Sequence, residues 1–167
     1  MRELSQRWLG VRLALAGRVH QYPEILALRR FLSAFRIDAL IDVGANEGQY
    51  AMQARRDAGF AGHIFSFEPN PDVFAVLERN AARDAKWHVF NMALSDFDGS
   101  VTFNIMAANQ FSSIAKPSER LDPIFTERNR VERTVEAPCR RLDGMLDELL
   151  GPHGLTRPFL KMDTQGH

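Results

Sequence analysis

Two acidic residues and two glycines stand where predicted strands end. Asp42 comes near the end of the apolar segment 39–43, and Gly44 and Gly48 follow it. Glu68 comes at the end of a second apolar segment. A carboxylate in that position can accept hydrogen bonds from both hydroxyls of a ribose, and a carboxylate beside the glycine turn favours positive charge nearby. These residue types therefore suit an unphosphorylated nucleoside that carries a cationic centre.

The spacing of the glycines restricts the possible classes of ligand further. It is G-x-x-x-G, whereas dinucleotide-binding dehydrogenases use G-x-G-x-x-G to bring a pyrophosphate onto a helix start. Asp42 would repel such a pyrophosphate, while the two glycines leave room for a ligand to approach the backbone. Adenosine, no phosphate and a positive charge together describe S-adenosylmethionine. A nicotinamide-dependent oxidoreductase fits the same alternation of strands and helices but not this glycine spacing.

Strands and helices alternate along the chain. We expect strands at 39–43, 63–70, 87–94 and 158–163. Asn46 is expected to cap a helix that ends near Gly59, and Asn70, followed by Pro71, is expected to cap the next helix. This rhythm predicts an α/β fold: a Rossmann-like, doubly wound, mostly parallel sheet with flanking helices. Asp42, Glu68, Asn91 and Asp163 then fall at the carboxyl ends of strands, where such sheets bind ligands.

The remaining segments are expected to lie around this sheet. Residues 1–36 read as helical, with Pro23 dividing two pieces, and 99–105 alternates with period two after a turn signal at Asp98-Gly99. That alternation predicts an antiparallel excursion. Further expected elements are a helix at 123–129, a strand at 133–139 that contains Cys139, and a helix over 142–150.

Composition excludes several classes of protein. The chain has 167 residues, which suits one domain, and its 21 basic and 21 acidic residues cancel, so nothing indicates a nucleic-acid or anionic-membrane surface. A single cysteine, Cys139, rules out an internal disulfide framework. No apolar segment approaches the roughly 18 residues of a spanning helix.

The N-terminal residues are expected to form an amphipathic helix packed on the domain, with a membrane-surface or targeting segment as the alternative. We expect a cytoplasmic protein.

Several motifs together resemble one family. "IDVGANEGQY", "FEPNP", "NMALSD", "SSI", "RRLDGML" and "LKMDTQG" are similar, in order and spacing, to the successive motifs of FkbM-type methyltransferases. These enzymes have the class I methyltransferase fold and use S-adenosylmethionine, mostly to methylate hydroxyls. The resemblance covers residues 38–167 and leaves a helical segment, 1–37, outside it. The family pattern continues past the last motif, so a fragment of a longer protein is expected, with a truncated homologue as the alternative.

The resemblance also implies roles for individual residues. The glycine turn would hold the methionine part of the cofactor, Glu68 the ribose, and residues 91–94 would flank the adenine. Ser112 and Ser113 would lie beside the cofactor, and Asp163 near the transferred methyl group. The cofactor-binding residues expected on this basis are Asp42, Gly44, Ala45, Asn46, Gly48, Glu68, Pro69, Asn91, Ala93, Leu94 and Ser113.

Methyl transfer is an in-line displacement at carbon, so the enzyme mainly aligns the acceptor and helps remove its proton. Asp163 is the candidate catalytic residue for that step; the alternative is that it only orders its loop or holds the amino group of the cofactor. The expected acceptor is a hydroxyl of a small metabolite or glycan. A non-catalytic module that binds the cofactor or a partner protein is the alternative function. The oligomeric state is not readable from the sequence.

No metal site is expected. The histidines are scattered along the chain and no pair has the spacing of metal ligands. They are His20, His63, His88, His153 and His167. His63 and His88 fall at the starts of strands, the opposite end of the sheet from the expected active site. His167, the last residue, is a weaker candidate base than Asp163.

Overall fold

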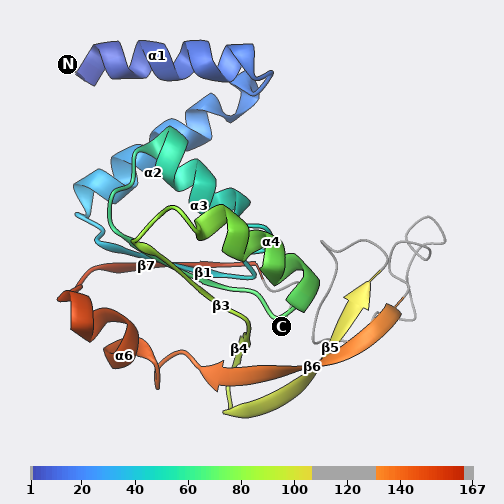
Figure 1. The fold of residues 1–167 in the computed structure, drawn as a ribbon. Helices are drawn as coiled ribbons and strands as arrows, with labels where there is room; N and C mark the ends of the chain where they lie inside the picture. The colour runs from blue at the N-terminus through green and yellow to red at the C-terminus, as the bar shows by residue number, and fades with distance from the viewer. Residues whose placement is uncertain (1, 107–130, 164–167) are drawn as a thin grey trace.

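A four-stranded parallel sheet forms the centre of the molecule. The computed structural model describes residues 2–106 and 131–163. The strands are β1 (Ala39–Val43), β2 (His63–Phe67), β3 (Trp87–Phe90) and β7 (Pro158–Met162), in the order β3-β2-β1-β7. Strand β2 pairs with one side of β1, and β3 pairs with the far side of β2. Strand β7 pairs with the other side of β1 (Figure 1). This confirms the predicted Rossmann-like sheet and places its change of direction between β1 and β7.

Helices cover both faces of this sheet (Figure 1). Helices α2 (Tyr22–Ala34), α3 (Gln49–Gln53) and α4 (Pro71–Ala81) lie on one face, and α6 (Leu146–Leu150) lies on the other. Because successive side chains of a strand point to opposite faces, neighbouring strand residues enter different cores. The core on the α2–α4 side includes Leu40, Ile64, Leu77 and Trp87; the core on the α6 side includes Ile41, Val43, Phe65, Phe67 and Met145.

The helical N-terminal segment breaks at a glycine rather than at Pro23. Helix α1 spans Arg2–Leu15 and is followed by Gly17 with φ 68°, a short 3-10 turn η1 (Val19–Gln21), and α2. Pro23 lies in the first turn of α2, where the missing N–H breaks no helical hydrogen bond. The expected division at Pro23 was therefore wrong, although the helical content was right. Among the described residues, no helix is long and apolar enough to cross a membrane.

The two predicted helix caps have different outcomes. Asn70 caps α4 as expected, because its side-chain oxygen accepts a hydrogen bond from the N–H of Asp72. The helix after β1 begins later than expected, with Gly48 in the left-handed conformation (φ 88°) as its N-cap. Asn46 instead accepts a hydrogen bond from the N–H of Glu47, within the turn. The helix continues as a π-helical segment, η2 (Ala54–Ala58), and stops at Gly59.

A second, smaller sheet carries the antiparallel excursion. The expected strand 87–94 is divided, since β3 ends at Phe90 and β4 (Ala93–Ser95) pairs with another sheet, in the order β4-β6-β5. There β5 (Gly99–Met106) runs antiparallel to β6 (Val131–Arg141), as the period-two pattern predicted, and Cys139 is buried in β6. The helix expected at 123–129 and the residues Ser112 and Ser113 lie outside the described residues.

Candidate functional site

The four polar residues expected at strand ends do lie at the carboxyl ends of the sheet. Asp42 is the fourth residue of β1, and Glu68, Asn91 and Asp163 each follow directly after β2, β3 and β7. Since the four strands are parallel, these ends share one edge of the sheet. The change of strand direction between β1 and β7 falls at the same edge, which is where open α/β sheets bind ligands.

Asp42 is completely buried and is paired with a lysine. Its relative exposure is 0%, and Lys161 Nζ lies 3.0 Å from its Oδ1. Neither carboxylate oxygen has an aligned hydrogen bond from any residue that the structure describes. Burial raises the pKa of Asp42, while the charge of Lys161 acts in the opposite direction. The sequence predicted a positively charged ligand beside Asp42. In the structure, Lys161 supplies a positive charge at that position.

Lys161 was not among the predicted site residues. Besides Asp42, its Nζ donates to the carbonyl oxygen of Gly44 at 3.3 Å and lies 3.9 Å from Oδ2 of Asp163. It also lies 5.7 Å from the centre of the Tyr50 ring. A signal was present in the sequence, since Lys161 is the charged residue of the otherwise apolar strand "PFLKM". Its partner could not be read there, because the register of β7 against β1 is a tertiary property.

Glu68 links two loops at the end of β2. Its Oε1 accepts a hydrogen bond from the N–H of Asn70 and its Oε2 accepts one from the N–H of Asn46, both at 2.9 Å. Its relative exposure is 7%. Burial raises the pKa of Glu68, and the two backbone donors act against that rise. A carboxylate offers about four lone pairs, so two donors leave each oxygen able to accept one more hydrogen bond.

The glycines of the turn are required by packing within the chain. Gly44 has φ 70°, and a Cβ there would collide with the backbone carbonyl of Asp163. At Gly48, with φ 88°, a Cβ would lie 2.6 Å from the ring of Trp87. The expectation that these positions keep space for a ligand was therefore incomplete: in the structure that space is filled by Asp163 and Trp87.

The residues expected around an adenine fall in two places. The amide of Asn91 donates to the carbonyl oxygens of Glu68, at 2.8 Å, and Pro69, at 3.3 Å, so it ties the end of β3 to the end of β2. Ala93 is buried in the core of the small sheet, and Leu94 packs on the α6 side of the main sheet. Ala45, also in the predicted set, is a buried residue of the glycine turn, and its N–H donates to the carbonyl oxygen of Phe67. Ser113 lies outside the described residues.

Asp163 is the most exposed of the strand-end acids. Its side chain has a relative exposure of 61%, while its backbone N–H donates to the carbonyl oxygen of Val43. The backbone is thus fixed against β1 and the carboxylate is free to meet solvent or a ligand. Lys161 Nζ lies 3.9 Å from Oδ2 of Asp163, so a positive charge stands beside this carboxylate.

The histidines are less scattered in space than in sequence. His63, His88 and His153 place three ring nitrogens within 4.8 Å of one another, which the spacing along the chain did not reveal. Burial, and then the neighbouring histidines, lower the pKa of His63; burial and His153 likewise lower that of His88. The cluster lies at the amino ends of β2 and β3, away from Glu68.

The sheet order β3-β2-β1-β7 and its flanking helices define a Rossmann-like α/β protein, with acidic residues at the carboxyl edge where such sheets bind ligands. The family model of the Methyltransferase FkbM domain matches residues 42–167, and the chain belongs to this family. A comparison with curated proteins gave no match. The family finding agrees with the resemblance carried by the sequence motifs.

Proposed function

We propose that this protein uses S-adenosylmethionine to methylate a hydroxyl of a small metabolite or glycan. Membership of the FkbM methyltransferase family supports methyl transfer in general. The cofactor and the oxygen acceptor are the finer part of the proposal. They rest on the residues at the carboxyl edge of the sheet, and above all on Glu68.

The main support for S-adenosylmethionine as the cofactor is the burial and hydrogen bonding of the Glu68 carboxylate. It is 7% exposed, held between the Asn46 and Asn70 N–H groups, and still has an unused lone pair on each oxygen. A vicinal diol presents two hydroxyl donors with about the spacing of two carboxylate oxygens. Glu68 therefore fits the ribose of an unphosphorylated nucleoside, whereas a phosphate at this position would meet a negative charge.

The glycine turn is proposed to hold the methionine part through its backbone. Gly44, Ala45, Asn46 and Gly48 form that turn, and Lys161 fixes its first carbonyl. Asp42 acts indirectly in this arrangement, since it is buried beneath Lys161 and positions it. Pro69 and Asn91 border the ribose position, while Ala93 and Leu94 support it from the packed interior.

Asp163 is the proposed catalytic residue. When bound, the cofactor supplies an activated methyl group and a neutral leaving group. The chain must then orient the acceptor hydroxyl and accept its proton as the oxygen attacks. The Asp163 carboxylate is exposed, its backbone is fixed against β1, and its Oδ2 lies 3.9 Å from Lys161 Nζ. These features suit a residue that aligns a hydroxyl and takes its proton.

Binding of S-adenosylhomocysteine by the full chain tests the proposal. We expect saturable binding in isothermal titration calorimetry and a rise in melting temperature, with neither effect from NAD. Binding of NAD in preference to S-adenosylhomocysteine would support the oxidoreductase alternative. Binding of neither would favour a partner-binding module and would refute the cofactor assignment.

Other features of the proposal follow from the sequence. The acceptor is taken to be a small molecule or glycan rather than nucleic acid or membrane lipid, because basic and acidic residues balance at 21 each. A cytoplasmic location and the division into a helical segment, 1–37, and a cofactor-binding domain, 38–167, stay predictions.

A further inference from the structure

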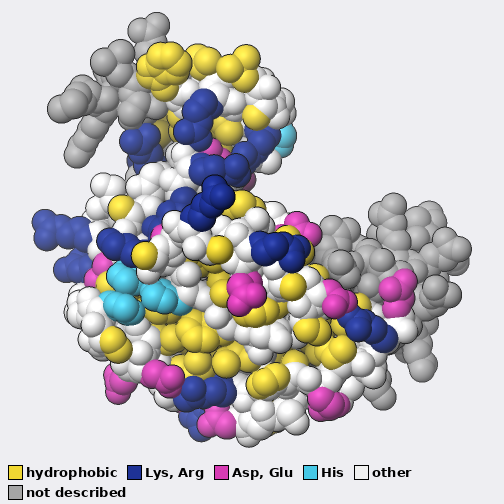
Figure 2. All heavy atoms as spheres, in the orientation of Figure 1, with side chains coloured by type: hydrophobic (Ala, Val, Ile, Leu, Met, Phe, Trp, Pro, Cys, Tyr) yellow, Lys and Arg dark blue, Asp and Glu magenta, His cyan; other side chains and the backbone are white. Residues whose placement is uncertain are grey.

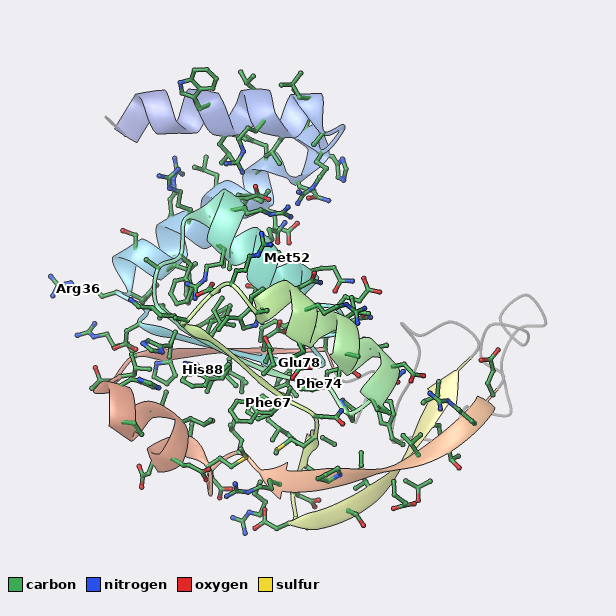
Figure 3. The ribbon with its side chains drawn as sticks, in the orientation of Figure 1. Arg36, Met52, Phe67, Phe74, Glu78 and His88 are labelled. Carbon is green, nitrogen blue, oxygen red and sulfur yellow. The ribbon has the colours of Figure 1, made fainter. Side chains whose placement is uncertain are left out.

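Three histidines from separate parts of the chain meet at the amino ends of the strands. His63 is the first residue of β2, His88 is the second residue of β3, and His153 closes η4 (Gly151–His153), the 3-10 turn after α6. Figure 2 shows a group of histidine side chains together at the left of the molecule, apart from another histidine at the upper right, and Figure 3 places His88 at that left end of the sheet. The cluster belongs to neither the nucleoside site nor the proposed methyl transfer.

The separations within the cluster suit a shared ligand. His63 Nδ1 and His88 Nε2 are 3.1 Å apart. Two nitrogens bound to one tetrahedral zinc ion, each at about 2.05 Å, would lie about 3.3 Å apart. The His153 ring stacks on that of His63 with a centroid distance of 4.1 Å, and its ligand nitrogen lies within 4.8 Å of the other two. Because His153 is exposed, a change of its side-chain rotamer can bring that nitrogen into the same coordination sphere.

Two cationic side chains lie near the cluster, and one of them is paired with a carboxylate. Arg55 lies nearby, but it pairs with Asp84 at 2.7 Å and donates to the carbonyl oxygens of Phe60 and Gly62. Lys86 donates to the carbonyl oxygen of Ala61. Two cations thus flank the cluster, and Asp84 offsets one of them, so an arriving divalent ion meets a small net repulsion rather than an unscreened positive field.

We propose that His63, His88 and His153 form a binding site for a transition-metal ion of the zinc type, with a fourth position left to water. Imidazole nitrogen is a good ligand for Zn²⁺, Ni²⁺ and Cu²⁺, and three histidines with an open position form a known zinc arrangement. Metal binding needs a lone pair on each of the two facing nitrogens. The ring that now donates between them therefore takes its other tautomer, with the proton on its second nitrogen.

The expected role is structural. From His63 to Glu68 is five residues of strand, or about 16 Å at roughly 3.3 Å per residue, which is too far for the ion to contact a ligand held by Glu68. An ion bound to all three histidines would fasten η4, and with it the connection from α6 to β7, onto β2 and β3. Metal should therefore raise the stability of the fold without being needed for nucleoside binding.

The test uses the full chain without an affinity tag, freed of metal by a chelator and titrated with ZnCl₂. We expect one ion bound per chain in calorimetry and a rise in melting temperature. With CoCl₂ in place of zinc, visible absorption bands of a low-symmetry site should develop to the same stoichiometry. His153→Ala should weaken zinc binding at least tenfold, and because His153 is exposed, the variant should fold as the parent does.

His20→Ala is the matched control, since His20 is not one of the three clustered histidines. His167→Ala changes the remaining histidine of the sequence. Both variants should bind zinc like the parent chain. Absence of binding, or binding that His153→Ala leaves unchanged, would overturn the site. Loss of binding in His167→Ala or His20→Ala instead would assign the ion to another place on the chain. Binding of S-adenosylhomocysteine is measured separately with and without zinc, so failure of the metal site leaves the proposed function standing.

Discussion

Asp42 and Lys161 are register partners in the parallel ladder between β1 and β7, and Lys161 Nζ lies 3.0 Å from Oδ1 of Asp42. Asp42 has no exposure, whereas the Lys161 side chain keeps 20%. The pair therefore joins a carboxylate inside the sheet to an ammonium group that reaches the carboxyl edge. It joins the two strands between which the strand order changes direction, and it sets the position of a cation next to Gly44 and Asp163.

Removing the lysine should destabilise the protein in a pH-dependent way. Lys161→Met leaves Asp42 as a buried charge without a partner, which costs about 3–5 kcal/mol for a fully buried pair. Because Lys161 is partly exposed, we expect a loss of about 2–4 kcal/mol in the free energy of unfolding at pH 7. Without Lys161, the raised pKa of Asp42 rises further, and the folded state then holds a proton that the unfolded state releases near pH 4. Stability should fall as pH increases through this window.

Chemical denaturation at pH 4.5 and pH 7 measures this effect. The variant should approach the parent at the lower pH, and the double variant Asp42→Asn/Lys161→Met should recover most of the loss at pH 7. An equal loss at both pH values would mean that Lys161 contributes by packing alone.

Glu68→Gln should weaken nucleoside binding while the chain stays folded. The amide turns one acceptor oxygen into a donor, so a ribose hydroxyl loses a charge-assisted hydrogen bond worth about 1.5–3 kcal/mol. This corresponds to a roughly 10- to 150-fold weaker affinity for S-adenosylhomocysteine. The control is Glu78→Gln, on the exposed side of α4, which should bind like the parent. Calorimetry with both variants decides the assignment, and unchanged affinity in Glu68→Gln would refute it.

A comparison of alanine variants at Gly48 and Gly59 distinguishes the cost of backbone strain from the cost of overpacking. Both have positive φ, 88° and 72°, but only at Gly48 does a Cβ meet neighbouring atoms, 2.6 Å away in Trp87. Gly59→Ala should therefore cost only the left-handed backbone term, about 1–2 kcal/mol. Gly48→Ala adds overpacking of about 1–3 kcal/mol. Urea denaturation of the two variants measures the difference, and equal losses would contradict the packing role of Gly48.

Asp38 should stabilise the protein only above acidic pH. Burial acts to raise its pKa, but hydrogen bonds from the backbone N–H groups of Thr156 and Arg157, each at 2.9 Å, outweigh it and hold the pKa below the usual value. A carboxyl with a lowered folded pKa contributes stability above its unfolded pKa and loses it as pH falls through the folded value. Asp38→Asn should cost about 1–2 kcal/mol at pH 7.

The measurement is the free energy of unfolding of Asp38→Asn between pH 7 and pH 3. Its difference from the parent should shrink towards the acidic end. Asp147→Asn, an exposed residue of α6, serves as the control and should show little change at either pH. A constant difference across the range would show that the charge of Asp38 has no part in joining the starts of β1 and β7.

The strand ends were the part of the site best predicted from sequence. Short buried strands and the Asn70-Pro71 cap are local signals, and they placed Asp42, Glu68 and Asp163 correctly at the carboxyl ends. The N-cap of α3 was missed because Gly48 is left-handed and lies close against Trp87, from a distant strand, and the local sequence does not specify that contact. The division of 87–94 was missed because β4 finds its partner in β6, about forty-five residues further along the chain.

The sequence by itself determined the class of fold, the family and the acidic edge of the sheet, because hydrophobic period, caps and motifs are properties of neighbouring residues. Only the tertiary structure decided which residues meet across that sheet. It placed Lys161 on Asp42 and brought His63, His88 and His153 together. The physical reason is that strand order and register fix such contacts, and both follow from packing of the whole chain rather than from spacing within any segment.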